Sequence, residues 1–416
     1  MSKPMRLLFA LLATLALVAA ACGSDSDGDT ATDDGDTATD EGDDSEADEG
    51  DDSEADEGDD SEADEGDDSE ADEGDDSDMN ATPGAGVSVT MARANWSTGY
   101  MQAAVYHDLM EELGYEVSDP ADLELPPSNF FTALGEGEVD FWANSWYPGH
   151  SSWWNNELTD GETVGDKISV LGEEMMAGGL QGFLTNKSLV EEHGITTLDQ
   201  INDDPELVAL YDAADTIPGD GIIQMLGCPE DWTCDDIINE TIEFAGWENI
   251  EQTKAGYDAM IAEAVARAED GTPFIIYTWT PSAYVTQLIP GQNAMWLAVE
   301  GTSVLDGSIT AEFDQTVDGV AKPAALGLDT CTNDPCHLGW VAADIQVSAN
   351  NEFLDANPAA KRLFELVQIP VIDVALQNVR YNGGEDTTED VNSHAAEWIE
   401  DNRATVDEWL AEARGA

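Results

Sequence analysis

The acidic N-terminal part of this chain excludes a compact fold in that region. Residues 23–80 contain 31 Asp or Glu and no Lys or Arg, and within 23–78 no side chain is aromatic or an aliphatic larger than Ala. The motif EGDDSEAD occurs four times in succession, at 41–48, 49–56, 57–64 and 65–72. Such a segment cannot bury enough apolar surface to offset the entropy of ordering, and repulsion between its charges extends it. We therefore expect 22–85 to form an extended tether rather than calcium-binding loops, since the repeats lack the glutamate spacing of an EF-hand.

The first 22 residues have the pattern of an export signal. Two basic residues precede an apolar run over 7–21, which is shorter than the roughly 20 residues that a membrane-spanning helix needs. The end of this run, AAACG at 19–23, resembles the lipobox of bacterial lipoproteins. The resemblance implies that a signal peptide, 1–21, is removed. It also implies that a lipid on Cys22 anchors the chain outside the cytoplasm, on the outer face of the cytoplasmic membrane or in the periplasm. The alternative is an ordinary cleaved signal with an incidental cysteine.

The remainder of the chain is acidic but able to form a core. Residues 81–416 carry 59 acidic and 11 basic side chains, a net charge of −48. Such a surface repels nucleic-acid phosphates and anionic lipid headgroups, so neither is expected to bind to it. Yet 42% of the whole chain is hydrophobic and 12 residues are Trp. We interpret the acidity as a solvation feature suited to high salt, where screening is strong.

Alternating and helical hydrophobic patterns follow one another along this remainder. Strand-like patterns cover 87–91, 139–142, 178–184 and 274–277. Helical spacing covers 100–113, 189–193, 257–269, 357–366, 372–379 and 391–412. Strands that alternate with helices predict an α/β architecture with mainly parallel sheets. Ligand sites in such sheets lie at the carboxyl ends of the strands, where this chain carries tryptophans.

Four cysteines follow the tether, at positions 228, 234, 331 and 336. In an exported protein an even number of closely spaced cysteines indicates disulfides. The spacings favour two local bridges, Cys228–Cys234 and Cys331–Cys336, although four cysteines allow three connectivities. A zinc site needs a different spacing of Cys or His, so we expect neither a metal nor a cofactor.

Three tryptophan-bearing segments also contain small or turn-forming residues. They are NSWYPGH at 144–150, CPEDWTC at 228–234 and YTWTP at 277–281. An aromatic face attracts a cation without a hydrogen bond, so several such faces around one pocket select a methylated ammonium group. Two other interpretations remain open from the residues alone, namely tryptophans buried in the core and a platform that stacks against sugars.

In addition to these segments, several short motifs occur in a fixed order. They are ELGYEV at 112–117, NPAA at 357–360, QIP at 368–370 and the closing Trp398 and Trp409. With the tryptophan segments they make the chain, from about Val87 onward, resemble the glycine betaine/proline betaine-binding proteins of osmoprotectant ABC transporters. The resemblance implies a two-lobe periplasmic-binding-protein-like fold of type II, with the ligand cleft between the lobes. Lobe one would be 86–182 plus 343–416, and lobe two 183–342.

The resemblance also implies two sets of ligand-binding residues. The aromatic box would consist of Trp146, Trp232 and Trp279. The ligand carboxylate would meet His150 and the backbone N–H groups of Thr233 and Cys234. The implied partners are a quaternary ammonium compound (glycine betaine, proline betaine or choline) and the permease subunits of the transporter.

Two other classes of function are alternatives to this one. An extracellular enzyme is not expected, because the sequence contains neither a G-x-S-x-G elbow nor an H-E-x-x-H helix and has only five His. A carbohydrate-binding surface protein would use its tryptophans as stacking platforms. The sequence does not show whether a betaine or choline is the preferred ligand, because the Ser282–Tyr284 stretch after Pro281 departs from the family's usual aromatic residues.

Overall fold

The computed structural model describes residues 82–300, 328–334 and 336–416. The predicted signal peptide, Cys22 and the predicted tether up to residue 81 lie outside the described residues. Among the helices of the described part, none is both long and apolar enough to cross a membrane.

One of the two larger sheets has three strands and is antiparallel throughout. Its order is β5 (Phe141–Tyr147), β12 (Ala343–Asn350) and β6 (Ile168–Gly179). The strand expected at 139–142 does not end in an aromatic loop, because β5 continues through Trp146 to Tyr147. All seven of its residues are buried. Two short parallel pairs of strands precede β5 in the sequence. They are β1 (Ser88–Val89) with β3 (Glu116–Val117), and β2 (Arg93–Ala94) with β4 (Glu124–Leu125).

The other larger sheet has five strands. In spatial order they are β11 (Ala294–Leu297), β7 (Gln181–Asn186), β10 (Ile275–Trp279), β8 (Ile223–Leu226) and β9 (Ile250–Thr253). Strand β7 is antiparallel to both of its neighbours, whereas β8 is parallel to β10 and β9. The expectation of mainly parallel sheets is therefore wrong for the two larger sheets. The local pattern shows which residues are buried, but it does not show which distant strand pairs with them.

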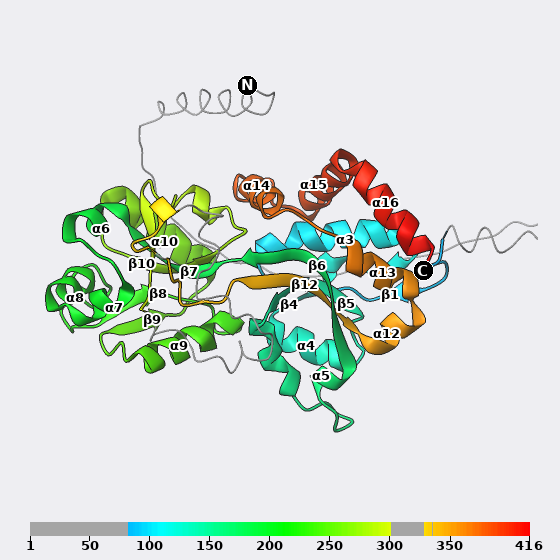
Figure 1. The fold of residues 1–416 in the computed structure, drawn as a ribbon, viewed down its shortest axis with the longest axis horizontal. Helices are drawn as coiled ribbons and strands as arrows, with labels where there is room; N and C mark the ends of the chain where they lie inside the picture. The colour runs from blue at the N-terminus through cyan, green and yellow to red at the C-terminus, as the bar shows by residue number, and fades with distance from the viewer. Residues whose placement is uncertain (1–81, 301–327, 335) are drawn as a thin grey trace, which may run out of the picture. The chain divides into compact units, whose positions relative to one another are not determined.

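Helices flank both sheets (Figure 1). Near the five-stranded sheet are α6 (Lys187–His193), α7 (Leu198–Asp203), α8 (Pro205–Asp212), α9 (Thr233–Ala245) and α10 (Tyr257–Asp270). Near the three-stranded sheet are α3 (Tyr100–Glu112), α4 (Pro127–Gly135), α5 (Val164–Lys167), α12 (Asn351–Ala356) and α13 (Pro358–Leu366). The C-terminal helices are α14 (Val371–Asn382), α15 (Thr388–Asp401) and α16 (Arg403–Arg414).

The helices predicted at 100–113, 189–193 and 257–269 are confirmed as α3, α6 and α10. Gly194 ends α6 in the left-handed conformation, with φ of 64°, which glycine adopts without steric cost. The single helix expected over 391–412 is wrong, because α15 and α16 are separate. Asn402 lies between them. Its side-chain amide donates to the carbonyl of Trp398 at 2.8 Å, a local bond that competes with continuation of the helix.

The two larger sheets are joined directly where β6 leads into β7. Only Leu180 separates the end of β6 from the start of β7. The backbone N–H of Thr280, the residue after β10, donates to the carbonyl of Leu180 at 2.9 Å. The carboxyl end of β10 is thus held against the junction between the sheets, and Trp279 is the last residue of that strand.

Candidate ligand-binding site

All six residues predicted to bind a ligand line a single cavity. The cavity has about 470 Å³ of empty space, its open side included. The predicted residues around it are Trp146, His150, Trp232, Thr233, Cys234 and Trp279. A fourth tryptophan, Trp96, lines the same cavity and was not among the predicted residues.

Each tryptophan comes from a different element. Trp146 is near the end of β5, Trp279 ends β10, Trp232 is the N-cap of α9, and Trp96 precedes the short 3-10 helix Ser97–Gly99. The ring of Trp146 lies so close to Gly179 that a Cβ at this position would come within 2.7 Å of the ring. Position 179 therefore has to be glycine for this ring position.

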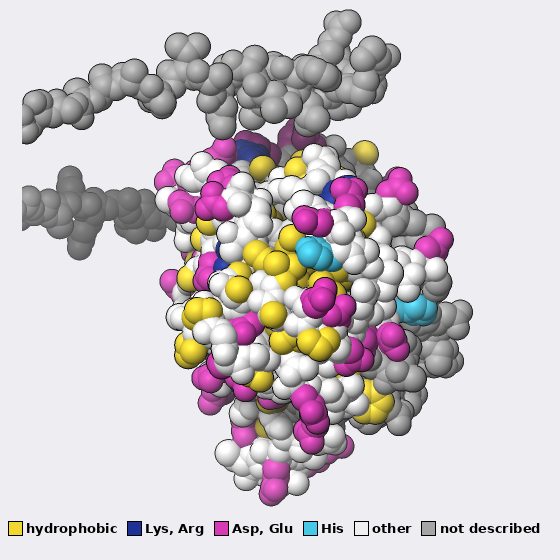
Figure 2. Space-filling view, turned by 90° about the vertical axis from the view of Figure 1, so that its left-hand side faces the viewer, with side chains coloured by type: hydrophobic (Ala, Val, Ile, Leu, Met, Phe, Trp, Pro, Cys, Tyr) yellow, Lys and Arg dark blue, Asp and Glu magenta, His cyan; other side chains and the backbone are white. Residues whose placement is uncertain are grey.

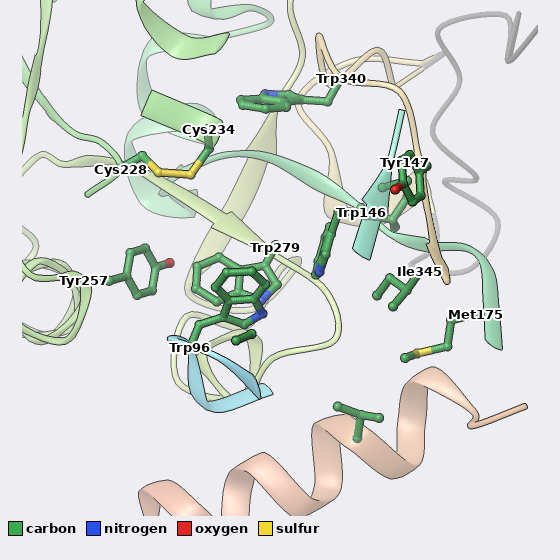
Figure 3. Close-up of a cluster of buried hydrophobic side chains, with 14 of the residues drawn as sticks. Trp96, Trp146, Tyr147, Met175, Cys228, Cys234, Tyr257, Trp279, Trp340 and Ile345 are labelled. Carbon is green, nitrogen blue, oxygen red and sulfur yellow. A yellow bond between two sulfur atoms is a disulfide. The ribbon is translucent and has the colours of Figure 1, made fainter. Parts of the chain in front are cut away.

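The rings of Trp96, Trp232 and Trp279 form one side of the cavity. Trp232 is nearly perpendicular to both others, with ring centres 5.5 Å from Trp96 and 5.5 Å from Trp279. The Trp279 indole donates to the hydroxyl of Thr98 at 3.3 Å. Figure 3 shows Trp146 standing apart from the rings of Trp96 and Trp279. Several π-faces around one space can enclose a cation that has no N–H group to donate.

A buried amide fixes two of these rings. The indole N–H groups of Trp96 and Trp146 both donate to Oδ1 of Asn144, each at 2.9 Å. Nδ2 of Asn144 in turn donates to Oε1 of Gln102 at 2.7 Å, and Nε2 of Gln102 donates to the carbonyl of Thr98 at 2.7 Å. Asn144 is 2% exposed and Gln102 and Thr98 are fully buried. Because these groups have no water to replace a lost partner, the network holds both indoles in one orientation.

His150 is a neutral hydrogen-bond donor in this site. It lies in the 3-10 helix Gly149–Asn155 and is 4% exposed. Burial lowers the pKa of its imidazole to about 3, so the ring is uncharged at neutral pH. The backbone N–H of Trp146 donates to Nδ1 at 3.0 Å, which assigns the ring proton to Nε2. In the part of the chain that the structure describes, Nε2–H has no acceptor and remains available to a ligand.

The N-terminus of α9 supplies further donors. Thr233 and Cys234 are the first two residues of this 13-residue helix, so their backbone N–H groups have no acceptor within it. The helix dipole also favours an anion at this end. Asp235, the next residue, is paired with Lys254 at 2.8 Å, which offsets its negative charge beside these donors.

The predicted pairing of Cys228 with Cys234 is the one that the structure contains, and Cys331 is paired with Cys336. The first pair joins the loop before Trp232 to the second residue of α9. The indole of Trp153, in the 3-10 helix Gly149–Asn155, donates to the hydroxyl of Thr233 at 3.1 Å and so contacts the same helix end.

Sequence reasoning missed Trp96 and the residues that support the rings. Trp96 is not followed by the Pro or flanked by the Cys that marked the other three segments; its only signal was its place just before a predicted helix. Tyr257 packs against two rings, with ring centres 5.8 Å from Trp232 and 4.5 Å from Trp279. The spacing of Tyr257 within α10 predicted only a buried helical residue.

The fold and this site define a class of protein. A mixed α/β structure has a cleft in which aromatic rings face a set of hydrogen-bond donors, and the cleft residues come from both larger sheets and their helices. This arrangement is typical of extracytoplasmic solute-binding proteins that enclose a small molecule. The predicted two-lobe α/β fold is confirmed.

Comparisons with known proteins identify the family. Residues 87–401 match the family described as the substrate binding domain of ABC-type glycine betaine transport systems. The chain therefore belongs to this family of transport proteins, which is not an enzyme family.

Curated relatives agree with this assignment, and solved structures share the fold. The chain is 30% identical over 335 residues to the glycine betaine-binding periplasmic protein OusX of Dickeya dadantii, covering 80% of this chain and 92% of that protein. It is 27% identical over 337 residues to the glycine betaine/proline betaine-binding periplasmic protein of Escherichia coli, with coverages of 80% and 92%. Lactococcal OpuAC in its closed form with glycine betaine shares the fold, with a TM-score of 0.54, 14% identity, and coverages of 78% and 99%. An ABC-transporter choline binding protein with choline shares it at 0.55 and 15% identity, with coverages of 78% and 92%.

Proposed function

We propose that this chain captures glycine betaine outside the cytoplasm and delivers it to the permease of an ABC transporter. The observation that carries the proposal is the division of the cavity lined by the four tryptophans, called the inner cavity from here on, into two chemically different sides. Trp96, Trp146, Trp232 and Trp279 present aromatic faces, and the imidazole of His150 and the N-terminus of α9 present donors. A trimethylammonium group fits the first side and a carboxylate fits the second.

The chemistry of the ligand explains why this site uses rings rather than carboxylates. A trimethylammonium group is cationic but has no N–H to donate, so its charge is best met by π-faces, at up to about 2 kcal/mol for each desolvated contact. The carboxylate accepts from Nε2–H of His150 and from the backbone N–H groups of Thr233 and Cys234. Hydrogen bonds to a charged acceptor contribute about 1.5–3 kcal/mol, so both ends of the ligand add to its affinity.

Binding also links the two proposed lobes, 86–182 plus 343–416 and 183–342. Trp96 and Trp146 belong to the first and Trp232 and Trp279 to the second, so a ligand held among these rings bridges the lobes. The contacts from Trp279 to Thr98 and from Trp153 to Thr233 already cross between them. A ligand that binds the closed form more tightly shifts the population toward it, and we propose that this form docks on the permease.

The N-terminal residues fit an anchored receptor. We propose that the mature chain begins at a lipid-modified Cys22 and that the acidic segment up to residue 85 tethers the receptor to the membrane. The two cysteine pairs would form disulfides in that oxidising location. Mass spectrometry of the mature protein tests the proposal and should find a chain that begins at Cys22 and carries a lipid. A chain that begins at another residue, or at Cys22 without a lipid, would contradict the anchor.

Isothermal titration calorimetry with glycine betaine, choline and a neutral sugar separates the candidate functions. Glycine betaine should bind most tightly, choline more weakly because it lacks a carboxylate, and the sugar should release no heat. Choline is the alternative ligand, and choline binding tighter than betaine would favour it. Heat from the sugar alone would favour a carbohydrate-binding protein, and turnover of any of these compounds would contradict our proposal that the chain is not an enzyme.

A matched pair of variants tests the role of His150. His150→Leu removes the donor and should weaken glycine betaine about 10- to 100-fold, because it removes a hydrogen bond to a charged group. His150→Gln keeps a side-chain N–H and should retain part of the affinity. Choline should lose little in either variant; an equal loss for both ligands would mean that His150 supports the fold instead of the carboxylate.

A further inference from the structure

A second cavity lies behind three of the four tryptophans. Trp96, Trp232 and Trp279 line both cavities and so form a partition between them. This outer chamber has about 910 Å³ of empty space, its open side included. Beyond the partition its aromatic lining consists of Tyr100, Tyr257, Tyr284 and Tyr381. Figure 3 shows Tyr257 on the far side of the Trp96 and Trp279 rings from Trp146.

The tyrosines of the outer chamber give it several π-faces. Tyr381 packs edge-on against Tyr100 with ring centres 5.6 Å apart, and the ring centres of Tyr257 and Tyr284 lie 5.2 Å apart. Tyr257 and Tyr284 are buried, and their hydroxyl groups are already used as donors, to the carbonyl of Tyr277 and to Asp258. The rings, rather than free hydroxyl donors, are therefore what these residues offer to a ligand.

The outer chamber is acidic, in contrast to the inner cavity. Asp258 and Asp386 line it, and no Lys or Arg is among its lining residues in the described chain. The guanidinium of Arg93 lies 3.9 Å from the ring centre of Tyr100, a lining residue, but is paired with Glu124 at 3.0 Å. Burial and the charge of Asp386 raise the pKa of the Tyr381 hydroxyl, as expected where the local field is negative.

We propose that the outer chamber is a second binding site, for quaternary ammonium cations that lack a carboxylate. Aromatic faces and two carboxylates attract such a cation, whereas the carboxylate of glycine betaine is repelled by Asp258 and Asp386. The inner cavity has the opposite preference, because its donors at His150 and at the start of α9 need an acceptor. A carboxylate-free cation therefore binds beside glycine betaine and does not merely compete with it. This proposal goes beyond betaine capture, because the carboxylates and tyrosines of the outer chamber do not line the inner cavity, although three tryptophans line both.

Titration of tetramethylammonium into the full chain saturated with glycine betaine tests this site. Ionic strength is held constant with sodium as the balancing cation. We expect one further equivalent of tetramethylammonium to bind. The double variant Asp258→Asn/Asp386→Asn should weaken this binding roughly tenfold, since two nearby charges are lost, and should leave glycine betaine affinity unchanged. Asparagine at 258 keeps an oxygen that accepts from the Tyr284 hydroxyl.

A control with the same change in net charge separates a site from general attraction to an acidic protein. Asp270 and Asp401 are exposed and end α10 and α15 without lining either cavity. Asp270→Asn/Asp401→Asn should therefore weaken tetramethylammonium by less than about twofold. A further variant, Tyr381→Leu, removes a π-face but no charge and should weaken it about two- to fivefold.

Two results would overturn the outer chamber as a site. One is the absence of tetramethylammonium binding to the betaine-saturated chain, and the other is an equal loss in the two double variants. If glycine betaine itself fails to bind, the inner-cavity proposal is wrong. In that case the same variants, titrated with tetramethylammonium in the ligand-free chain, still decide whether the outer chamber binds cations.

Discussion

The four tryptophans of the inner cavity are held in two different ways. Trp96 and Trp146 are fixed by polar contacts, because both indoles donate to the one buried oxygen of Asn144. Trp232 and Trp279 are fixed mainly by packing, because both contact the ring of Tyr257. The polar pair depends on one acceptor that has no substitute in a buried site, whereas the packed pair depends on a shape that other rings can fill. The polar pair should therefore be the more sensitive to a single substitution.

The largest loss of affinity for glycine betaine is expected from Asn144→Leu. The variant leaves two indole N–H groups and Oε1 of Gln102 unpaired in the interior, at about 1–3 kcal/mol each. We expect the free energy of unfolding to fall by about 3 kcal/mol or more and the affinity by about 100-fold, because two walls of the cavity lose their orientation. Calorimetry and chemical denaturation measure the two quantities.

Asn350→Leu is the matched control for this variant. Asn350 is also a buried amide, and it caps α12 and donates to the carbonyl of Leu134 at 2.9 Å, but it does not line the inner cavity. It should lose stability and keep its affinity. Equal losses of affinity in both variants would show that general destabilisation, and not the indole contacts, explains the effect.

A smaller loss is expected when the packed pair loses its support. Tyr257→Ala removes two aromatic contacts of about 0.5–1.5 kcal/mol each, so the affinity for glycine betaine should fall about 30-fold. Tyr257→Phe keeps the ring and loses only the hydroxyl that donates to the carbonyl of Tyr277 at 2.8 Å. Calorimetry should find the Phe variant close to the original chain; a loss as large as in the Ala variant would mean that Tyr257 is held as a polar anchor too.

A steric change sharpens the comparison from the side of the polar pair. Gly179→Ala places a Cβ about 2.7 Å from the ring of Trp146, so the ring has to move although its acceptor, Asn144, is unchanged. Overpacking of this kind costs about 1–3 kcal/mol, and we expect about a tenfold loss of affinity. Gly256→Ala, where a Cβ meets nothing within 4 Å, is the control and should bind normally. Unchanged binding in Gly179→Ala would show that Trp146 tolerates a shift.

The smallest effect on affinity is expected from pH. Since burial lowers the pKa of His150 to about 3, its donor at Nε2 is unchanged between pH 5 and 8, and glycine betaine affinity should stay constant there. Stability should respond, because the unfolded chain takes up a proton below its usual histidine pKa while the folded site does not. The contribution of neutral His150 is therefore complete above about pH 6.5 and is lost as pH falls toward 3, by about 1.4 kcal/mol per pH unit.

His150→Gln removes this titration and is the comparison for the pH series. Denaturation of both proteins between pH 4 and 7 should show a shallower fall in the variant. Parallel curves would mean that His150 is not held neutral in the fold.

The acidic residues of the described chain differ in where they lie, on the surface or in the outer chamber. Acidic side chains are spread over one face of the molecule in Figure 2, with few Lys or Arg among them. Inside the inner cavity, by contrast, aromatic rings and N–H groups form the predicted ligand contacts. The net charge of −77 is thus not the feature that would recognise a cationic ligand in the inner cavity. The carboxylates proposed for that role are Asp258 and Asp386, which line the outer chamber.

Local patterns in the sequence were enough for several conclusions. The tether at 22–85 rests on composition, since a segment without large apolar side chains cannot form a core, and it stays a prediction because the chain up to residue 81 lies outside the described residues. The helices α3, α6 and α10 followed from the spacing of apolar residues, because a helix repeats its buried face over a few positions. The six candidate site residues were implied by the family resemblance that short motifs such as the cysteine-flanked Trp232 carry, and the structure places all six around one cavity.

Only the tertiary structure decided which distant residues meet. Strand β12 pairs with β5 and β6 although more than 150 positions separate them in the chain, and this sheet is antiparallel where a parallel one was expected. Asn144, Trp96 and Tyr257 became part of the site through contacts that no local pattern records. The physical reason is that periodicity shows which face of an element is buried but not what covers it, and here the covering side chains determine how the rings around the ligand are held.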